Sequence, residues 1–251
     1  MKDFTVFPLL EGSLGRCLFQ LYYAKYYSEI HNIELKLIRD DSSENQIILD
    51  RLFPGIKMIS YPQKYTTLDY SEESHAIQPT SEYTQLKGVP MLYKYCSHTN
   101  LFPNWKNALM KASIQVIVDA NLINYEMQRN TWMIHYKDDT SLDTYYKLCM
   151  DLIPSGKRLH VFSNKECREA ILELTKNQNI VVTFSKETQP LQALYEMTYC
   201  LGGSITANSS FGWWGAFYAR KRALNFGHKM ASYYPETSNV VPSWGTKIAI
   251  H

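Results

Sequence analysis

Apolar positions in the first sixty residues form short runs separated by longer stretches of mixed polarity. The apolar run Phe4–Leu10 predicts a buried strand, and the periodic stretch after it predicts a helix from about Arg16 to His31. The pattern next predicts a strand at Ile33–Arg39, a helix at Asn45–Leu52 and a strand at Lys57–Tyr61. This order is typical of parallel βαβ units.

The middle of the chain has a weaker pattern. Gln63–Gln85 shows no clear period, which predicts an excursion with little regular structure. Val89–Tyr95 predicts a strand and Asn104–Lys111 a helix, while residues 113–130 predict a helix or link into the second half.

The second half alternates more regularly. The predicted elements are strand Thr131–Tyr136, helix Leu142–Leu152, strand Leu159–Ser163, helix Lys165–Lys176, strand Ile180–Phe184, helix Leu191–Tyr199, strand Ser204–Thr206, loop and helix Asn208–Arg220, and strand Ala223–Phe226. The whole pattern predicts an α/β protein with two Rossmann-like halves, residues 1–125 and 126–251. A ligand crevice is expected between them, at the carboxyl ends of the strands.

Charge and cysteine usage narrow the partners and the compartment. The 26 basic and 24 acidic residues give a net charge of +2 without a basic stripe, which argues against nucleic acid as a partner. The five cysteines form no C-x-x-C pair, which favours a reducing compartment over a disulfide framework. No apolar run is long enough to cross a bilayer. We therefore expect a cytoplasmic protein whose membrane contact, if any, is peripheral.

Tyrosines cluster in the first predicted helix. Tyr22, Tyr23, Tyr26 and Tyr27 are spaced as neighbours on a helix face. Tyrosine rings can stack on sugars, but this spacing favours packing in a core.

A glycine turn joins the first predicted strand to the first predicted helix. Gly12 and Gly15 stand where backbone N–H groups can approach an anion or a sugar closely. The two glycines can equally serve the turn alone.

Two cationic or titratable side chains lie at the C-terminal end of the predicted strand Thr131–Tyr136. A lysine at the position of Lys137 can hold a pyrophosphate, and His135 can hydrogen-bond a base or a phosphate. The alternative is a partly buried histidine beside a solvated lysine.

The adjacent carboxylates Asp138 and Asp139 also allow two interpretations. Such a pair can bind a divalent metal together with a diphosphate, or it can cap the next helix with Thr140 and Ser141. We favour the cap because no third oxygen ligand stands at a suitable spacing, and we expect no metal.

The stretch Ala207–Ala216, A-N-S-S-F-G-W-W-G-A, is the most informative. Small polar side chains just before a helix offer hydroxyl and N–H groups to an anion, which the helix dipole favours. The two tryptophans would pack the helix against its sheet. A plain helix cap followed by core tryptophans explains the pattern equally well.

Together these motifs resemble the α-1,2-fucosyltransferase family over most of the chain. Gly12–Gln20 is similar to its G-G-L-G-N-Q-M-F-Q pattern, and Ala207–Ala216 closely matches its A-N-S-T-F-S-W-W-G-A pattern. Leu92–Phe102 resembles G-Y-F-Q-S-x-K-Y-F, Val161–Ser163 resembles the start of F-S-D-D, and Val241–Trp244 resembles I-P-x-x-W.

The resemblance implies a GT-B-type fold and metal-independent, inverting transfer from GDP-fucose to a glycan hydroxyl. It implies that Ser209 and Ser210 bind the donor diphosphate and that His135 contacts the base. Lys137 stands at the first arginine of the family's H-x-R-R-G-D-Y pattern, which stabilises charge on the departing phosphate. The donor-binding residues expected on these grounds are Gly12, Gly15, His135, Ser163, Asn164, Asn208, Ser209, Ser210 and Phe211.

The sequence departs from the family pattern at three places that bear on catalysis. Lys137 keeps the charge of the first arginine without its forked geometry, and Asp138 replaces the second. Asn164 stands at the first acidic position of F-S-D-D, where an amide offers guanine one acceptor group. Arg16 replaces the asparagine of the opening pattern and is a candidate substitute for the missing arginine. The expected catalytic residues are thus Lys137, Arg16 and Asp138.

Three functional hypotheses follow. The leading one is a fucosyltransferase that uses GDP-fucose and a glycan acceptor, needs no cofactor, and has no assigned general base, with Glu11 and Asp138 as candidates. The N-terminal half would hold the acceptor and the C-terminal half the donor. The alternatives are the same fold with another nucleotide sugar, and a glycan- or nucleotide-binding protein without catalysis.

Overall fold

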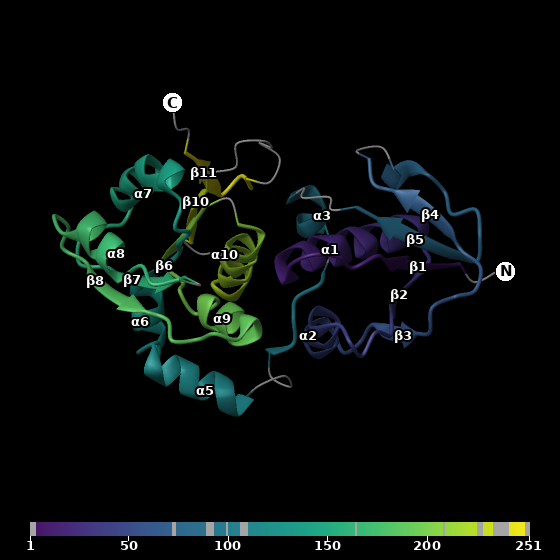
Figure 1. The fold of residues 1–251 in the computed structure, drawn as a ribbon, viewed down its shortest axis with the longest axis horizontal. Coiled ribbons are helices and arrows are strands. Elements are labelled where there is room, and N and C mark those ends of the chain that lie inside the picture. The colour runs from purple at the N-terminus through teal and green to yellow at the C-terminus, as the bar shows by residue number, and fades with distance from the viewer. Residues whose placement is uncertain are drawn as a thin grey trace. The chain divides into compact units, whose positions relative to one another are not determined.

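The chain forms two compact units, residues 1–108 and 109–251. The structure, a computed structural model, describes residues 4–71, 74–88, 93–98, 100–105, 110–163, 165–207, 209–224, 228–232 and 241–248. Each unit combines helices with its own sheet (Figure 1). The sequence pattern predicted the boundary between the two halves later in the chain, after residue 125. The difference concerns α5 (Met110–Asp119), which packs against α9 (Pro190–Met197) in the second unit.

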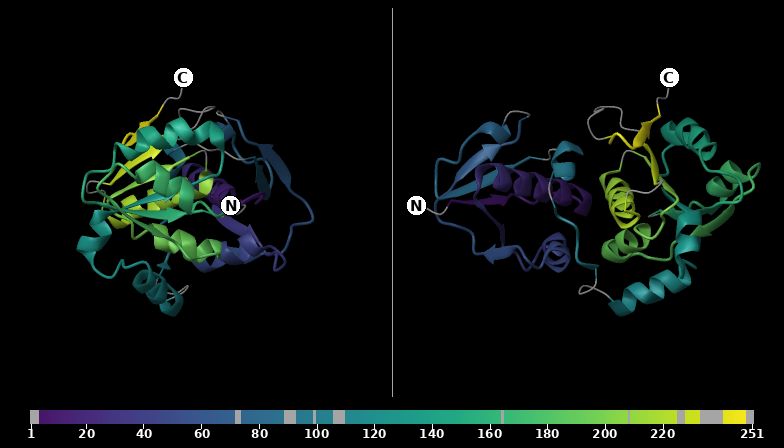
Figure 2. Two further views of the ribbon diagram at one scale, coloured as in Figure 1. Left: turned by 60° about the vertical axis from the view of Figure 1, so that its left-hand side comes forward. Right: turned by 180° about the vertical axis from the view of Figure 1, so that it is seen from behind.

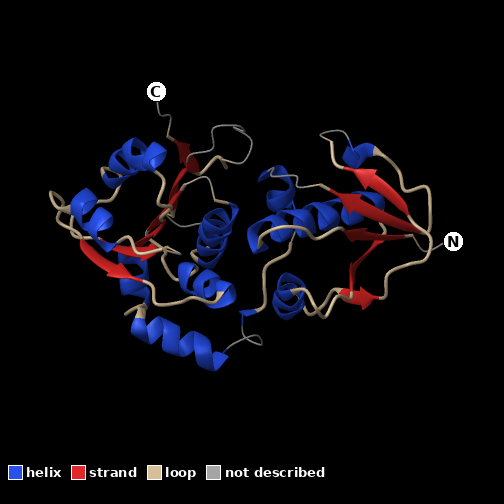
Figure 3. Cartoon of the chain, viewed as in Figure 1, coloured by secondary structure: helices blue, strands red, loops and turns tan. Residues whose placement is uncertain are grey.

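The first unit contains a five-stranded sheet in the order β3-β2-β1-β5-β4, with every neighbouring pair parallel. The strands are β1 (Thr5–Pro8), β2 (Glu34–Ile38), β3 (Lys57–Ile59), β4 (Thr66–Asp69) and β5 (Tyr83–Lys87). The helices are α1 (Leu14–His31), α2 (Glu44–Leu52) and α3 (Tyr93–His98), with a 3-10 turn η1 (Ser74–Ala76). Figure 3 separates the two kinds of element by colour.

Helix α1 supplies much of the core of this unit. Its Tyr22, Tyr23 and Tyr27 are at most 2% exposed, so the prediction that the tyrosines pack in a core is confirmed for these three. Two of these buried hydroxyls form hydrogen bonds: Tyr23 Oη lies 2.7 Å from Ser74 Oγ, and Tyr27 Oη donates to the carbonyl of Ile77 at 2.7 Å.

Two expectations for the first unit are wrong. Residues 63–85 are not an irregular excursion, because they contain β4, η1 and the start of β5. The strand predicted at Val89–Tyr95 is contradicted where the structure describes it, because Tyr93–Tyr95 belong to the start of α3, while residues 89–92 lie outside the described residues. The strand β5 ends before this segment, at Lys87, and Gly88 follows it with a φ of +107°.

The second unit contains a six-stranded sheet in the order β11-β10-β9-β6-β7-β8, again parallel throughout. The strands are β6 (Thr131–His135), β7 (Arg158–Phe162), β8 (Val181–Phe184), β9 (Gly203–Thr206), β10 (Lys229–Ser232) and β11 (Gly245–Lys247). The helices besides α5 and α9 are α6 (Tyr125–Asn130), α7 (Asp143–Met150), α8 (Arg168–Thr175) and α10 (Ser210–Arg222), with a 3-10 turn η2 (Thr140–Leu142).

Helices cover both faces of this sheet (Figure 2). On one face, α7 and α8 enclose a core that includes Tyr145, Tyr146 and Ile171. On the other face lie α9 and α10, and Trp213 and Trp214 of α10 are fully buried. The expectation that the two tryptophans fix this helix is therefore confirmed.

The strand expected at residues 223–226 is contradicted where the structure describes it. Ala223 is the C-cap of α10 and Leu224 has a φ of +51°, while residues 225 and 226 lie outside the described residues. The strand β10 starts at Lys229, where it pairs with β9. Of the helix expected at 104–111, the segment 106–109 lies outside the described residues.

All five cysteines are free and buried. Burial raises the pKa of Cys17 to about 11 and that of Cys149 to about 12, because a thiolate loses hydration there. Across the described part of the chain, no helix has the length and apolar character to span a bilayer.

Candidate functional site

The expected site of the second unit lies at one edge of its sheet. The register pairs His135 with both Phe162 and Thr206, so the carboxyl ends of β6, β7 and β9 are level with one another. The residues that leave these strands therefore emerge side by side, as expected for a ligand edge in a parallel sheet.

His135 packs directly against the first turn of α10. A Cβ atom at Gly212 would lie 2.7 Å from His135 Cβ and 3.1 Å from its Nδ1, closer than side-chain carbons approach. The ring also meets Phe211 edge to face, with centroids 5.7 Å apart. Glycine at position 212 is thus what allows the imidazole to lie against the helix.

The electrostatics keep this imidazole neutral. Burial, with a smaller contribution from the charge of Lys137, lowers the pKa of His135 to about 4. Within the described residues, the buried Nδ1 of His135 has no hydrogen-bond partner. A neutral imidazole carries one donor and one acceptor nitrogen, so it can hydrogen-bond a base or a phosphate without adding charge.

The N-terminus of α10 combines a cap with exposed positions. The buried Ser209 is the N-cap, and its Oγ accepts the backbone N–H of Gly212 at 3.1 Å. Ser210 and Phe211, the first two helical residues, are partly exposed. The first turn has no acidic residue, so the positive end of the helix dipole is not neutralised locally. Asn208 lies outside the described residues.

Lys137 is held at the end of β6 by its main chain. Its N–H donates to Tyr146 Oη at 2.8 Å, and Tyr146 is fully buried in α7. The side chain of Lys137 is partly buried, and this burial lowers the pKa of the ammonium group from its usual value. A partly desolvated cation attracts a phosphate more strongly than one in bulk water.

The two aspartates after Lys137 behave differently. Asp139 Oδ1 accepts from the N–H of Ser141 at 3.0 Å and from its hydroxyl at 2.7 Å, so Asp139 caps the 3-10 turn η2 that leads into α7. The N-cap of α7 itself is Leu142, which makes no side-chain cap. Asp138 is exposed and lies 3.6 Å from Lys165 Nζ.

Ser163 follows β7 at the same edge and is partly exposed. Its Oγ accepts the N–H of Lys165 at 3.3 Å, which starts the turn towards α8. Asn164, at the expected base-reading position, lies outside the described residues.

The glycine turn of the first unit is a separate feature. Gly12 has a φ of +87°, and its carbonyl accepts from Asn45 Nδ2 at 2.8 Å. Arg16 is exposed and folds over the turn, since its Cδ would lie 3.0 Å from a Cβ at Gly12. Gly15 is buried in the first turn of α1, and the exposed Glu11 donates its N–H to Gln20 Oε1 at 3.0 Å. The roles expected for these residues stay predictions.

The first unit also has a shallow hollow that the motifs did not indicate. Its volume is about 560 Å³, and Phe53, Ile56 and Phe102 contribute to its apolar lining. Glu34 and Lys57, which are paired at 2.7 Å, also line it. These residues start β2 and β3, so the hollow adjoins the amino ends of those strands.

The sequence did not indicate two buried tyrosines of α7 that hold the strand ends at the site by hydrogen bonds. Tyr145 Oη donates to the carbonyls of Thr206 at 2.9 Å and Ala231 at 3.1 Å, which joins the ends of β9 and β10. Tyr146 holds Lys137 as described. Two adjacent tyrosines in a helix otherwise polar on one side were the available signal, but their spacing predicts only burial.

Comparison with known proteins identifies similarity in fold. No protein-family model and no curated protein matches the sequence. A solved structure of a mutant of FUT1 from Arabidopsis thaliana in complex with GDP matches with a TM-score of 0.57 and 13% identity, covering 95% of this chain and 72% of that chain. A glycosyl transferase of family 9 from Veillonella parvula matches with a TM-score of 0.51 and 10% identity, covering 95% and 83%.

These similarities concern fold. The expected class, an α/β protein of the GT-B type with two Rossmann-like halves, is confirmed by the two parallel sheets and the two neighbours. The crevice expected between the halves, the donor and the catalytic residues stay predictions.

Proposed function

We propose that this protein is an inverting glycosyltransferase that transfers fucose from GDP-fucose to a glycan hydroxyl, forming an α-1,2 linkage. The main support is one arrangement at the sheet edge: the neutral His135 ring lies against the N-terminus of α10, beside the strand end that carries Lys137. The similarity in fold to a fucosyltransferase structure with bound GDP adds to it.

In this proposal the acceptor hydroxyl attacks C1 of the fucose while the bond from C1 to the β-phosphate oxygen breaks. The leaving GDP gains negative charge as that bond breaks. The N–H groups and dipole of α10, the hydroxyl of Ser210 and the ammonium of Lys137 would stabilise that charge. Ser209 would contribute mainly by capping α10, because its Oγ already accepts a hydrogen bond from the N–H of Gly212.

The remaining roles follow the sequence resemblance. His135 would contact the base of the nucleotide from the end of β6, with its ring fixed against α10. Ser163, Asn164, Asn208 and Phe211 would complete the donor site. Gly12 and Gly15 would bind the donor, and Arg16 would act as a catalytic cation in place of the missing arginine. The general base stays open between Glu11 and Asp138. We propose that transfer needs no metal, so chelation with EDTA should leave turnover unchanged.

Calorimetric titration with GDP, UDP, ADP and CDP tests the proposal. GDP should bind best, and Lys137→Ala and Ser210→Ala should each weaken it. For Lys137→Ala, loss of a charge-assisted contact corresponds to about 10- to 100-fold. Lys176→Ala is the matched control, because Lys176 is an exposed lysine of the same unit paired with Glu173. The Lys176→Ala variant should bind GDP with the same affinity as the unmodified protein.

The same titration separates the alternatives. Preference for UDP, ADP or CDP would replace the GDP-fucose assignment by another donor, whereas absence of nucleotide binding would remove the proposed site. Tight GDP binding without turnover would favour a binding protein. In that case Lys137→Arg, which restores the forked cation, should not produce activity.

A further inference from the structure

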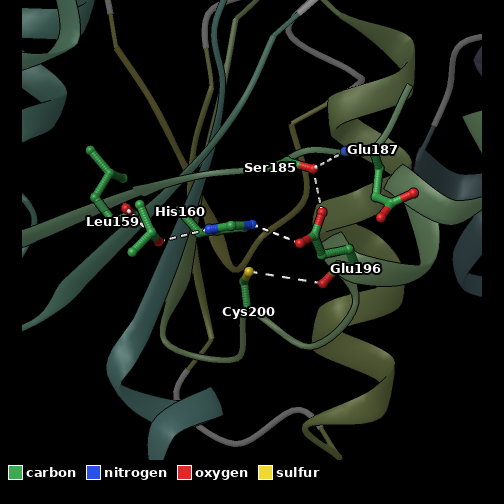
Figure 4. Close-up of polar contacts among 7 residues, drawn as sticks. Leu159, His160, Ser185, Glu187, Glu196 and Cys200 are labelled. Atoms are coloured by element: carbon green, nitrogen blue, oxygen red, sulfur yellow. Dashed lines mark hydrogen bonds and ion pairs between the residues drawn. The ribbon is translucent and has the colours of Figure 1, made fainter. Parts of the chain in front are cut away.

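A buried polar network lies inside the second unit (Figure 4). His160 in β7 is 1% exposed and Glu196 in α9 is 3% exposed. His160 Nε2 lies 2.9 Å from Glu196 Oε1, and its Nδ1 lies 2.7 Å from Thr183 Oγ1. The second carboxylate oxygen of Glu196 accepts a short hydrogen bond from Ser185. The network thus joins β7, β8 and α9.

Ser185 is the point at which the network meets the surface. It begins the loop 185–189 between β8 and α9, and its N–H donates to the carbonyl of Val161 at 2.8 Å. Its Oγ also accepts the N–H of Glu187 at 3.1 Å. Because Val161 pairs with Phe184, Ser185 stands level with Phe162, one residue before Ser163. The start of the loop therefore lies beside the expected donor residues.

Packing alone does not require this network. Burying two ionisable side chains is costly, and an apolar pair of similar volume often holds a helix on a sheet equally well. A carboxylate differs from an apolar side chain in being directional, since its two oxygens fix the positions of two donors. Glu196 uses one oxygen for His160 and the other for Ser185, and so fixes a loop as well as a helix.

We infer that Glu196, oriented by His160, is a positioning residue that holds the loop 185–189 in the conformation required for nucleotide binding. This inference rests on the proposed function. The carboxylate orients the Ser185 hydroxyl, which in turn holds the main chain of Glu187. A nucleotide that contacts this edge of the sheet then binds a loop that is already ordered. Binding therefore loses less conformational entropy than it would with a loop that is ordered only in the complex.

The test compares variants that loosen the loop with one that does not. Ser185→Ala removes the link to the loop and leaves the His160–Glu196 pair. The double variant His160→Leu with Glu196→Leu replaces the pair by apolar side chains and should keep its folding stability. Both should bind GDP about tenfold more weakly. Thr183→Val is the control, because it changes the far side of His160 and keeps the contact from Glu196 to Ser185.

Calorimetry with GDP and thermal unfolding are measured on each full-length variant. The inference holds if GDP affinity falls in Ser185→Ala, which the thermal scan shows to be folded at the temperature of the titration, while the affinity of Thr183→Val stays unchanged. Ser185→Ala should also lose some Tm, because Glu196 loses a hydrogen-bond donor. It is overturned if Ser185→Ala binds GDP as tightly as the unmodified protein, whether or not the double variant folds. If the unmodified protein binds none of the four nucleotides, the proposed function fails, and this inference fails with it.

Discussion

Replacing Gly212 by alanine probes the contact between His135 and α10 most directly. The added methyl group would lie 2.7 Å from His135 Cβ and 3.1 Å from its ring Cγ and Nδ1. Carbon atoms normally pack about 3.5–4.0 Å apart, so the ring and the helix must separate by about 1 Å. Separation would move the first turn of α10 away from the end of β6.

The expected cost has two opposing parts. Overpacking of this kind costs about 1–3 kcal/mol, whereas alanine in place of glycine within a helix gains about 1 kcal/mol. We expect Gly212→Ala to lower the free energy of unfolding by about 1 kcal/mol and to weaken GDP binding about tenfold. Urea denaturation gives the first value and calorimetry the second.

Gly215→Ala separates the site from general stability. A Cβ at Gly215 would lie 2.5 Å from Met197 Sδ and 3.2 Å from Met133 Cε, one turn along α10 from the expected phosphate position. This variant should lose stability and keep its GDP affinity. If Gly212→Ala binds GDP normally, or if both variants lose affinity equally, His135 and the helix terminus do not form the binding contact.

Three further predictions concern the same edge. The pKa of His135 is lowered to about 4 and that of His228 to about 3 by burial, so the folded state binds fewer protons than the unfolded state below pH 6.5. Stability should therefore fall as the pH drops from 6.5 towards 4. His135→Gln should reduce the slope of the unfolding free energy against pH by about 1.4 kcal/mol per pH unit in this range. An unchanged slope would contradict a buried, neutral His135. Ser209→Ala should lower the unfolding free energy by about 1 kcal/mol through loss of the N-cap, and a thermal scan without any change in Tm would argue against the cap. Tyr146→Phe leaves the N–H of Lys137 without the hydroxyl that accepts it at 2.8 Å, so GDP affinity should fall with little change in secondary structure by circular dichroism.

The sequence predicted the elements whose periodicity agrees with their tertiary pairing. The strands β6 and β7 and the helix α10 lie close to their expected positions, because apolar runs and turn residues coincide there. The strand β5 was missed because Tyr83–Lys87 is locally less apolar than the segment after it, and only its position between β1 and β4 makes it a strand.

The sequence predicted which residues lie at the site, but it did not predict the contacts that these residues make. The pattern of strands brought His135, Lys137 and the stretch before α10 to one sheet edge. It could not reveal that Gly212 makes room for the His135 ring, because the need for glycine arises from a neighbour distant in sequence. The His160–Glu196 pair was missed for the same reason, since each residue alone is an ordinary polar position in a strand or a helix.

The reactivity of the buried cysteines can be used to measure local opening of the structure. Cys17 and Cys96 lie in the first unit, and Cys149, Cys167 and Cys200 lie in the second. A protonated, enclosed thiol reacts with an alkylating reagent only when its surroundings open, because the thiolate is the reactive form. Pulsed alkylation followed by peptide mass analysis would therefore measure opening separately in each unit, without any substitution in the sequence.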